Sequence, residues 1–184
     1  LFSVVDWQQR AAARRAWQHR LEGIERAGLN RGDQINYDIF ARQLGDELSE
    51  FEFGIHSMPI SDRFGFHTSF PELPKQVPLV TVQDFENYVS RLSKFSEFVD
   101  HNIDLMRHGI RRGVTQPAVV FEGYREPLAA HVVDDPERSL LYEPLRDLPT
   151  TVPQSEPERL RAAPREAMTA SVSPGLAAFL QFLR

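Results

Sequence analysis

The stretch DQINYDIFARQLGDELSEFEFGIH, residues 33–56, has the clearest periodicity in the chain. Its large apolar side chains recur at steps of three and four residues, at Tyr37, Phe40, Leu44, Leu48, Phe51 and Ile55. This spacing places one apolar stripe along an α-helix. Asn30 or Asp33 can cap the helix, because either side chain accepts hydrogen bonds from the first backbone N–H groups. The stretch therefore predicts a long helix that buries one face.

Residues 6–27 predict a second helix just before it. The positions at the same spacing are Trp7, Ala11, Arg14, Trp17, Leu21 and Ile24. Asp6 is a candidate N-cap, and Gly28 is a candidate end of this helix. Because only a few residues separate the two helices, we expect an antiparallel hairpin.

The helix predicted over residues 6–27 carries a basic side made of Arg10, Arg14, Arg15 and Arg20. Acidic residues elsewhere in the chain offset this charge. The interpretation we favour is a solvated helix face, and the alternative is a docking face for an acidic partner.

Further helical patterns follow over residues 82–112, 117–131, 136–146 and from about 156 toward the end. Thr81 with Asp84 resembles a capping box, and Ser155 with Glu158 forms another. A break is expected near Ser93 and Ser96. Two prolines, at 164 and 174, are expected to kink or divide the last helix. No convincing strand pattern appears, so the predicted fold class is all-α, an assembly of antiparallel helix hairpins or a bundle.

Residues 57–80 interrupt the helical pattern with four prolines, Gly65 and several phenylalanines. We interpret this segment as an irregular but ordered loop packed over the helices, because its aromatic content argues against disorder. One interpretation is structural, with Phe64, Phe66 and Phe70 filling the core. The other is functional, because loops on a rigid helical scaffold often carry binding residues.

Composition limits the classes of partner. The 184 residues carry a net charge of −5, which argues against a general nucleic-acid binder. No apolar run approaches the roughly 18 residues that a membrane helix needs. Cysteine is absent, which excludes disulfides and thiolate metal sites. No intact signal peptide is visible, so both a cytoplasmic chain and one secreted after removal of a signal stay open.

The sequence shows no complete catalytic motif. The zinc-hydrolase pattern His-Glu-x-x-His, the phosphate-binding glycine patterns and the Gly-x-Ser-x-Gly pattern are all missing. His101 and His108 are seven residues apart, about 10 Å along a helix, which is too far for shared ligation. Asp100, His101 and Asp104 are interpreted as a solvated helix face. No catalytic residue and no metal ligand is therefore assigned within this chain.

Short motifs in a fixed order run through nearly the whole chain. They are Asn36-Tyr37-Asp38, Glu50-Phe51-Glu52-Phe53, Met58-Pro59-Ile60, Gly65-Phe66-His67-Thr68, Leu73-Pro74, Asp84-Phe85-Glu86-Asn87-Tyr88, Arg91-Leu92, Phe95, Gly109-Ile110-Arg111-Arg112-Gly113-Val114-Thr115-Gln116-Pro117 and Leu141-Tyr142-Glu143-Pro144-Leu145. In this order they resemble the N-terminal part of a bacterial family catalogued as domain of unknown function 885.

The resemblance implies a longer, largely helical parent protein. Members of that family look like gluzincin-type zinc metallopeptidases, with a His-Glu-x-x-His helix in their later part. Residues 1–184 would then be an N-terminal helical region of a larger domain, with the rest of the polypeptide as its partner. Zinc would be bound in the parent protein and not by this chain, and the substrate would be a peptide or small amide.

Two hypotheses of function follow. In the first, the chain helps to form the substrate cleft of such an enzyme: His67 and Thr68 would donate or accept hydrogen bonds to substrate, while Phe64 and Phe66 would supply apolar contact. In the second, the chain is a stand-alone helical module that binds a protein or peptide. The apolar run at residues 177–184, which has no cap or stop, motivates the second hypothesis. A purely structural segment is a third, weaker interpretation.

Overall fold

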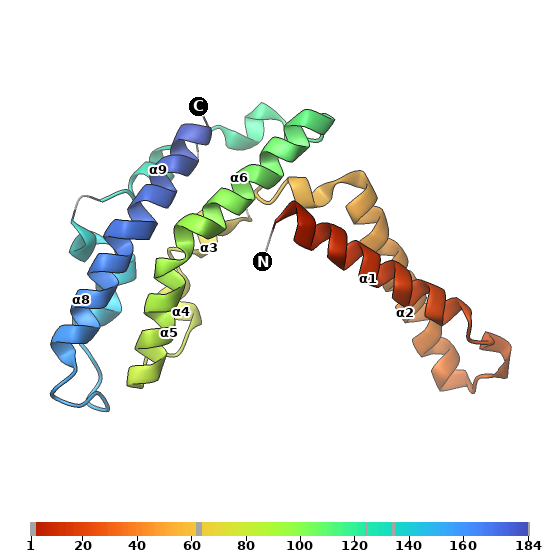
Figure 1. Cartoon of the computed structure of the whole chain (residues 1–184), viewed down its shortest axis with the longest axis horizontal. Helices are drawn as coiled ribbons and strands as arrows, with labels where there is room; N and C mark the ends of the chain where they lie inside the picture. The colour runs from red at the N-terminus through yellow and green to blue at the C-terminus, as the bar shows by residue number, and fades with distance from the viewer. Residues whose placement is uncertain (1–2, 62–63, 124, 134, 184) are drawn as a thin grey trace. The chain divides into compact units, whose positions relative to one another are not determined.

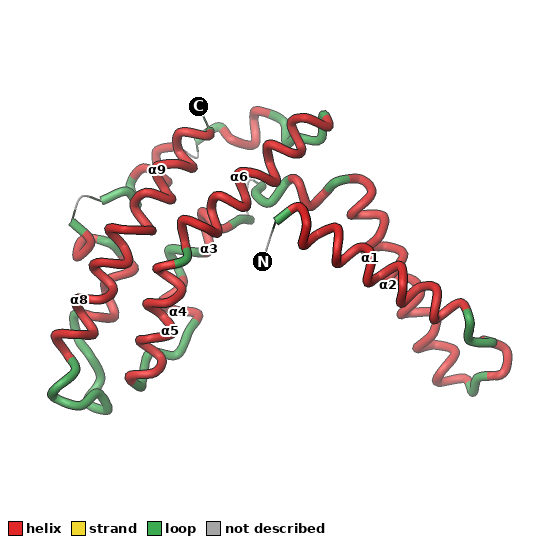
Figure 2. The backbone as a smooth tube through the Cα atoms, viewed as in Figure 1, coloured by secondary structure: helices red, strands yellow, loops and turns green. Residues whose placement is uncertain are grey.

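The computed structural model describes residues 3–61, 64–123, 125–133 and 135–183. Helices make up the ordered elements of these residues, and no strand occurs among them, which confirms the all-α prediction (Figure 2). The chain divides into two compact units. Unit 1 comprises Leu1–Pro59 and Asp104–Thr115, and unit 2 comprises Ile60–Ile103 and Gln116–Arg184. None of the described helices is long and apolar enough to cross a membrane.

Unit 1 is built on the predicted antiparallel hairpin of α1 (Val4–Glu22) and α2 (Arg31–Phe53), which lie side by side (Figure 1). A short 3₁₀ turn, η1 (Arg26–Gly28), joins them. Ala11, Leu44 and Leu48 are buried along the seam, at the spacing that the sequence predicts. The last part of α6, residues 104–112, also belongs to this unit.

The ends of α1 differ from the prediction. Ser3, not Asp6, is the N-cap, and Asp6 is the third helical residue of a capping box, in which its carboxylate accepts from the Ser3 backbone N–H at 2.9 Å. Because both residues carry capping side chains, the sequence alone did not separate the two roles. The helix also ends at Glu22 with Gly23 as its C-cap, well before Gly28. For α2, Asn30 is the cap: its side-chain oxygen accepts from the Asp33 N–H at 3.0 Å.

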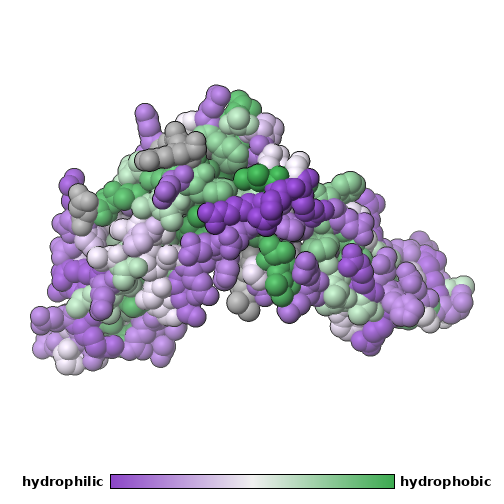
Figure 3. Space-filling view, turned by 45° about the horizontal axis from the view of Figure 1, so that its top comes forward, coloured by the Kyte–Doolittle hydropathy of each residue, from purple (hydrophilic) through white to green (hydrophobic). Residues whose placement is uncertain are grey.

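Charged side chains connect the two helices of the hairpin. Arg14 pairs with Glu47, and Arg15 lies 3.7 Å from a carboxylate oxygen of Glu52. The Arg20 guanidinium lies over the Trp17 ring. In the view of Figure 3, hydrophilic residues cover most of the visible surface at the end of the hairpin that carries η1. Part of the predicted basic side of α1 is thus neutralised by acids of α2.

Unit 2 is built on α5 (Val82–Ser93), the first part of α6 (Phe95–Arg112), α8 (Pro157–Ala167) and α9 (Ser173–Phe182). The predicted break falls at Lys94, between α5 and α6. The hydroxyl of Ser171 accepts from the Ser96 backbone N–H at 2.9 Å and so caps the start of α6 from 75 residues away. Ser171 belongs to a π-helical turn, η6 (Met168–Val172), which divides α8 from α9 as the two prolines predicted.

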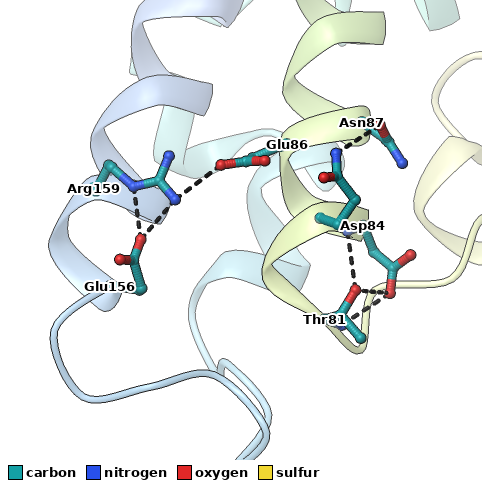
Figure 4. A network of polar contacts seen from close by, with 7 residues as sticks. Thr81, Asp84, Glu86, Asn87, Glu156 and Arg159 are labelled. Atoms are coloured by element: carbon teal, nitrogen blue, oxygen red, sulfur yellow. Dashed lines mark hydrogen bonds and ion pairs between the residues drawn. The ribbon is translucent and has the colours of Figure 1, made fainter.

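Polar contacts lie at the start of α5 and the start of α8 in unit 2 (Figure 4). The Thr81 and Asp84 capping box is present, as predicted. The second predicted box is wrong: Glu156, not Ser155, is the N-cap of α8, with no side-chain capping bond. The Glu156 carboxylate instead binds Arg159, which also lies 3.0 Å from Glu86 of α5. Arg159 thereby connects α8 to α5.

Proline content explains why the expected helices over 117–131 and 136–146 are shorter pieces. The first segment forms η3 (Ala118–Phe121) and α7 (Arg125–Ala129), joined through Gly123 at φ +83°. The second forms two 3₁₀ helices, η4 (Pro136–Arg138) and η5 (Leu140–Leu145). Pro144 lies inside η5, where an α-helical hydrogen bond would need the N–H that proline lacks.

The interior of unit 2 is aromatic and comes from distant segments. Tyr88 is fully buried, and its hydroxyl donates to the Leu141 backbone oxygen at 2.7 Å. Burial raises the pKa of this phenol far above its usual value, so the hydroxyl keeps its proton and remains a donor. The other large, fully buried side chains include Phe85, Phe95, Tyr142, Leu145 and Phe179.

Candidate functional site

The segment 57–80 contains three short helical turns: the end of η2 (Ile55–Ser57), α3 (Phe66–Ser69) and α4 (Leu73–Gln76). Gly65 sets the position of α3. Its backbone lies at φ +149°, and a Cβ there would be 2.7 Å from both His67 Nδ1 and Ile60 Cγ2. Only glycine fits this conformation and this space. Its carbonyl oxygen then accepts from the hydroxyls of Thr68 and Ser69, at 2.9 and 3.1 Å.

The four expected site residues occupy three different environments. Phe66 is 5% exposed, and its ring packs against Phe95, Phe98 and Phe179 with centroid distances of 6.3, 5.6 and 4.7 Å. It therefore fills the core, as the structural interpretation of the loop expects. The same interpretation is wrong for Phe64, which is 75% exposed and does not fill the core. Only His67 and Thr68 lie together on the wall of a pocket.

This pocket lies within unit 2 and has a volume of about 600 Å³, the size of a small-ligand site. It is formed where α3 and the turn after it face η3 and α7. Its lining residues are His67, Thr68, Pro71, Glu72, Val119, Val120, Glu122, Gly123, Pro127, Leu128 and His131. The wall from residues 119–128 is mainly apolar, and the wall from residues 67–72 is mainly polar.

His67 is the most deeply buried polar group of the pocket, at 7% exposure. Burial lowers the pKa of its imidazole below the usual value, so the ring is neutral at neutral pH. A neutral imidazole has one nitrogen that donates and one that accepts. Because Thr68 donates its proton to Gly65, its hydroxyl oxygen keeps lone pairs that can accept.

Two carboxylates add negative charge to the pocket. Glu72 pairs with Lys75 at 2.6 Å, which neutralises part of its charge, and Glu122 lies on the opposite side. The pocket thus combines an apolar wall with the neutral hydrogen-bonding groups of His67 and Thr68 and with two carboxylates. This combination suits a ligand that has both an amide and an apolar side chain.

Within the described ranges, no three His, Asp, Glu or Cys side chains gather closely enough to hold a metal ion. The Asp104 carboxylate, part of a sequence cluster interpreted as solvated, lies 3.3 Å from Arg107.

The sequence analysis assigned no site role to Glu72, Glu122, Leu128 or His131, which also line the pocket. The pocket brings together segments about 50 residues apart, which local patterns do not reveal. Leu128 belongs to the helical pattern predicted over residues 117–131, and the structure buries it almost fully. Nothing local indicates that this segment faces α3.

Comparison with known proteins gives one match. A family model described as "Bacterial protein of unknown function (DUF885)" matches residues 2–184. No curated protein matches the chain. No solved structure matches it either.

Proposed function

The chain belongs to the DUF885 family of bacterial proteins, and we propose that it forms part of the substrate cleft of a zinc-dependent peptidase. In this proposal the chain lies on the N-terminal side of the catalytic part of a longer protein and binds peptide or small amide substrates. The zinc-binding helix lies elsewhere in that protein. When bound there, zinc together with a general base would activate water for attack on the amide carbonyl.

The pocket lined by His67 and Thr68 is the observation that carries this proposal. His67 is neutral and nearly buried, so it can hydrogen-bond a peptide group without bringing a charge into the site. Thr68 can accept from a peptide N–H, while Leu128 and the two valines opposite can contact an apolar side chain. In this proposal the residues of this chain contribute to substrate binding, and the zinc ligands belong to the rest of the parent protein.

The test uses the natural full-length protein. We expect about one zinc per chain by mass spectrometry and cleavage of a subset of a peptide library. His67→Ala should lower kcat/KM for the best peptide by about tenfold, the size of one lost hydrogen bond to substrate. The matched control is His101→Ala, on α6 and outside the pocket lining. Unchanged kcat/KM in the His67 variant for every cleaved peptide would remove the assigned role, and a protein without zinc or peptidase activity would remove the enzyme.

A second candidate function is the stand-alone binding module. The observation that favours it is a set of apolar side chains exposed on the α1–α2 hairpin: Trp17, Ile24, Ile35 and Ile39. Such side chains are often covered by a partner. The sequence of the natural product separates the two candidates, because only the peptidase requires a His-Glu-x-x-His helix downstream.

A further inference from the structure

A second group of polar side chains lies in unit 1, apart from the pocket described above. His56 follows α2 in η2 and is 8% exposed. Its imidazole stacks on the ring of Phe51 at 4.8 Å between centroids and on that of Trp7 at 5.5 Å. The ring of His108, from the last part of α6, lies 6.4 Å away. Three segments thus bring two imidazoles and an indole together.

Two glycines make this arrangement possible. Gly54 adopts a left-handed conformation, φ +79°, which ends α2 and turns the chain so that His56 folds back over Phe51. Gly109 lies where η2 meets α6: a Cβ there would be 3.0 Å from the Ser57 Cβ and 2.4 Å from the Val114 backbone oxygen. The bare backbone at Gly109 therefore lets η2 pack directly against α6.

Three buried polar atoms of this group have no hydrogen-bond partner among the described residues. They are Trp7 Nε1, His56 Nδ1 and Ser57 Oγ. Burying a polar group without a hydrogen-bond partner costs free energy. Three such groups in one cluster therefore suggest that a bound molecule or ion supplies the missing partners. The indole N–H can only donate, and the occupant must therefore contain a hydrogen-bond acceptor.

The surrounding charge is positive. His108 and Arg112 of α6 both act on His56 and, after burial, lower the pKa of its imidazole. From α1, Arg10 lies over the Trp7 ring. Three acidic groups of the helices packed against His56 have partners of their own: the Asp6 carboxylate accepts from Ser3, Glu52 faces Arg15, and Asp104 lies 3.3 Å from Arg107. An acceptor drawn to this environment is an anion.

We propose that Trp7, His56, His108 and Arg112 form a binding site for a small oxyanion, either a carboxylate or a phosphate group. One oxygen would accept from the indole N–H and the His56 ring. The distance between the imidazoles is short enough for the same anion to accept from His108 as well. Arg112, at the exposed end of α6, supplies the opposite charge. This site is independent of the proposed peptidase function.

Binding is coupled to a proton. An anion beside His56 would favour the charged imidazole and so oppose the effects that lower its pKa. The complex therefore takes up a proton, and affinity rises as the pH falls from about 7.5 to about 6.

Titration calorimetry on the natural full-length protein tests the site. The probes are sodium phosphate and sodium acetate, each compared with chloride at equal ionic strength, at about pH 6 and about pH 7.5. We expect saturable binding that is tighter at the lower pH. Trp7→Phe, which keeps an aromatic ring and removes the N–H, should weaken binding about tenfold, as should Arg112→Gln. Trp17→Phe and Arg111→Gln, on the same two helices, are the matched controls and should leave affinity unchanged.

The outcomes are distinct. Binding of phosphate alone identifies a phosphate site, and binding of both probes identifies a site for carboxylates also. Arg112 is exposed, so its variant keeps the fold, and a normal unfolding temperature separates loss of binding from loss of structure. If neither probe binds saturably, buried water satisfies the three polar atoms and the proposal is overturned. Binding that is unchanged in both test variants would overturn it equally.

Discussion

Unit 1 and unit 2 are both helical, but they depend on different features of the sequence. The apolar side chains described as buried in unit 1 are Ala11, Leu44, Leu48, Leu105 and Met106, and charged pairs connect its long helices. Unit 2 has short helices interrupted by proline and an interior of large aromatic rings. Periodicity is therefore enough to predict the hairpin, whereas unit 2 is specified by contacts between segments far apart in the chain.

The largest expected effect is on the interior of unit 2. Leu92 is fully buried in α5, and Leu92→Ala should lower the free energy of unfolding by about 3–5 kcal/mol, because the removed methyl groups leave a cavity. Leu48→Ala in α2 should cost less, about 2 kcal/mol, because Leu48 is 7% exposed and so loses less buried surface than Leu92. Urea unfolding measures both. Equal costs would contradict the difference that we draw between the two units.

Backbone conformation at the pocket gives the next effect. Gly65→Ala would put a Cβ within 2.7 Å of two side chains in a left-handed conformation, so we expect a loss of about 2–3 kcal/mol and displacement of His67. The control is Gly113→Ala, because Gly113 has φ +69° but nothing within 4 Å of its Cβ position. This control should show strain without the clash, about 1 kcal/mol. Urea unfolding measures the loss of free energy of unfolding in both variants. A Gly65 variant that loses no more than the Gly113 variant would show that the pocket wall shifts to accommodate the added Cβ.

A buried hydrogen bond joins distant parts of unit 2. Tyr88→Phe removes the hydroxyl that binds the Leu141 carbonyl and leaves that oxygen buried without this donor. The expected loss is about 1–2 kcal/mol. Tyr37→Phe in the hairpin, where the ring is half-buried, should change the free energy of unfolding by much less. Thermal unfolding compares the Tm of the two variants. Equal shifts would show that the hydrogen bond from Tyr88 to the Leu141 carbonyl does not contribute to stability.

These contrasts explain what the sequence predicted. The steps from Tyr37 to Phe51 predicted α2, and Thr81 with Asp84 predicted the start of α5, because helix periodicity and capping are local. The sequence singled out His67 and Thr68 as candidate binding residues, and they lie on one side of the pocket. Its other wall required knowledge of the contact with residues 119–131. The His56 group was hidden for a similar reason, because its residues meet only after Gly54 ends α2 and η2 packs on α6.

Acid should destabilise both units through a histidine in each. His56 and His67 have pKa values below the usual 6.5 in the folded chain, so the unfolded chain binds more protons as the pH falls below 6.5. The contribution of each histidine to the free energy of unfolding is complete above pH 6.5. It decreases as the pH falls below 6.5, by at most about 1.4 kcal/mol per pH unit for each histidine. His56→Gln or His67→Gln should reduce this slope in urea unfolding.

The smallest effects are expected from exposed ion pairs, where the two units should be alike. Arg159→Gln removes contacts to Glu86 and Glu156 in unit 2, and Arg26→Gln removes the paired hydrogen bonds to Asp38 in unit 1, at 2.6 and 2.7 Å. Exposed pairs gain little because water and salt screen the charges while two long side chains lose freedom. Both variants should lower Tm only slightly, and about 1 M salt should abolish the difference from the unmodified protein. A large, salt-resistant loss for Arg159 alone would show instead that its hydrogen bonds and packing, and not only its screened charge, hold α5 and α8 together.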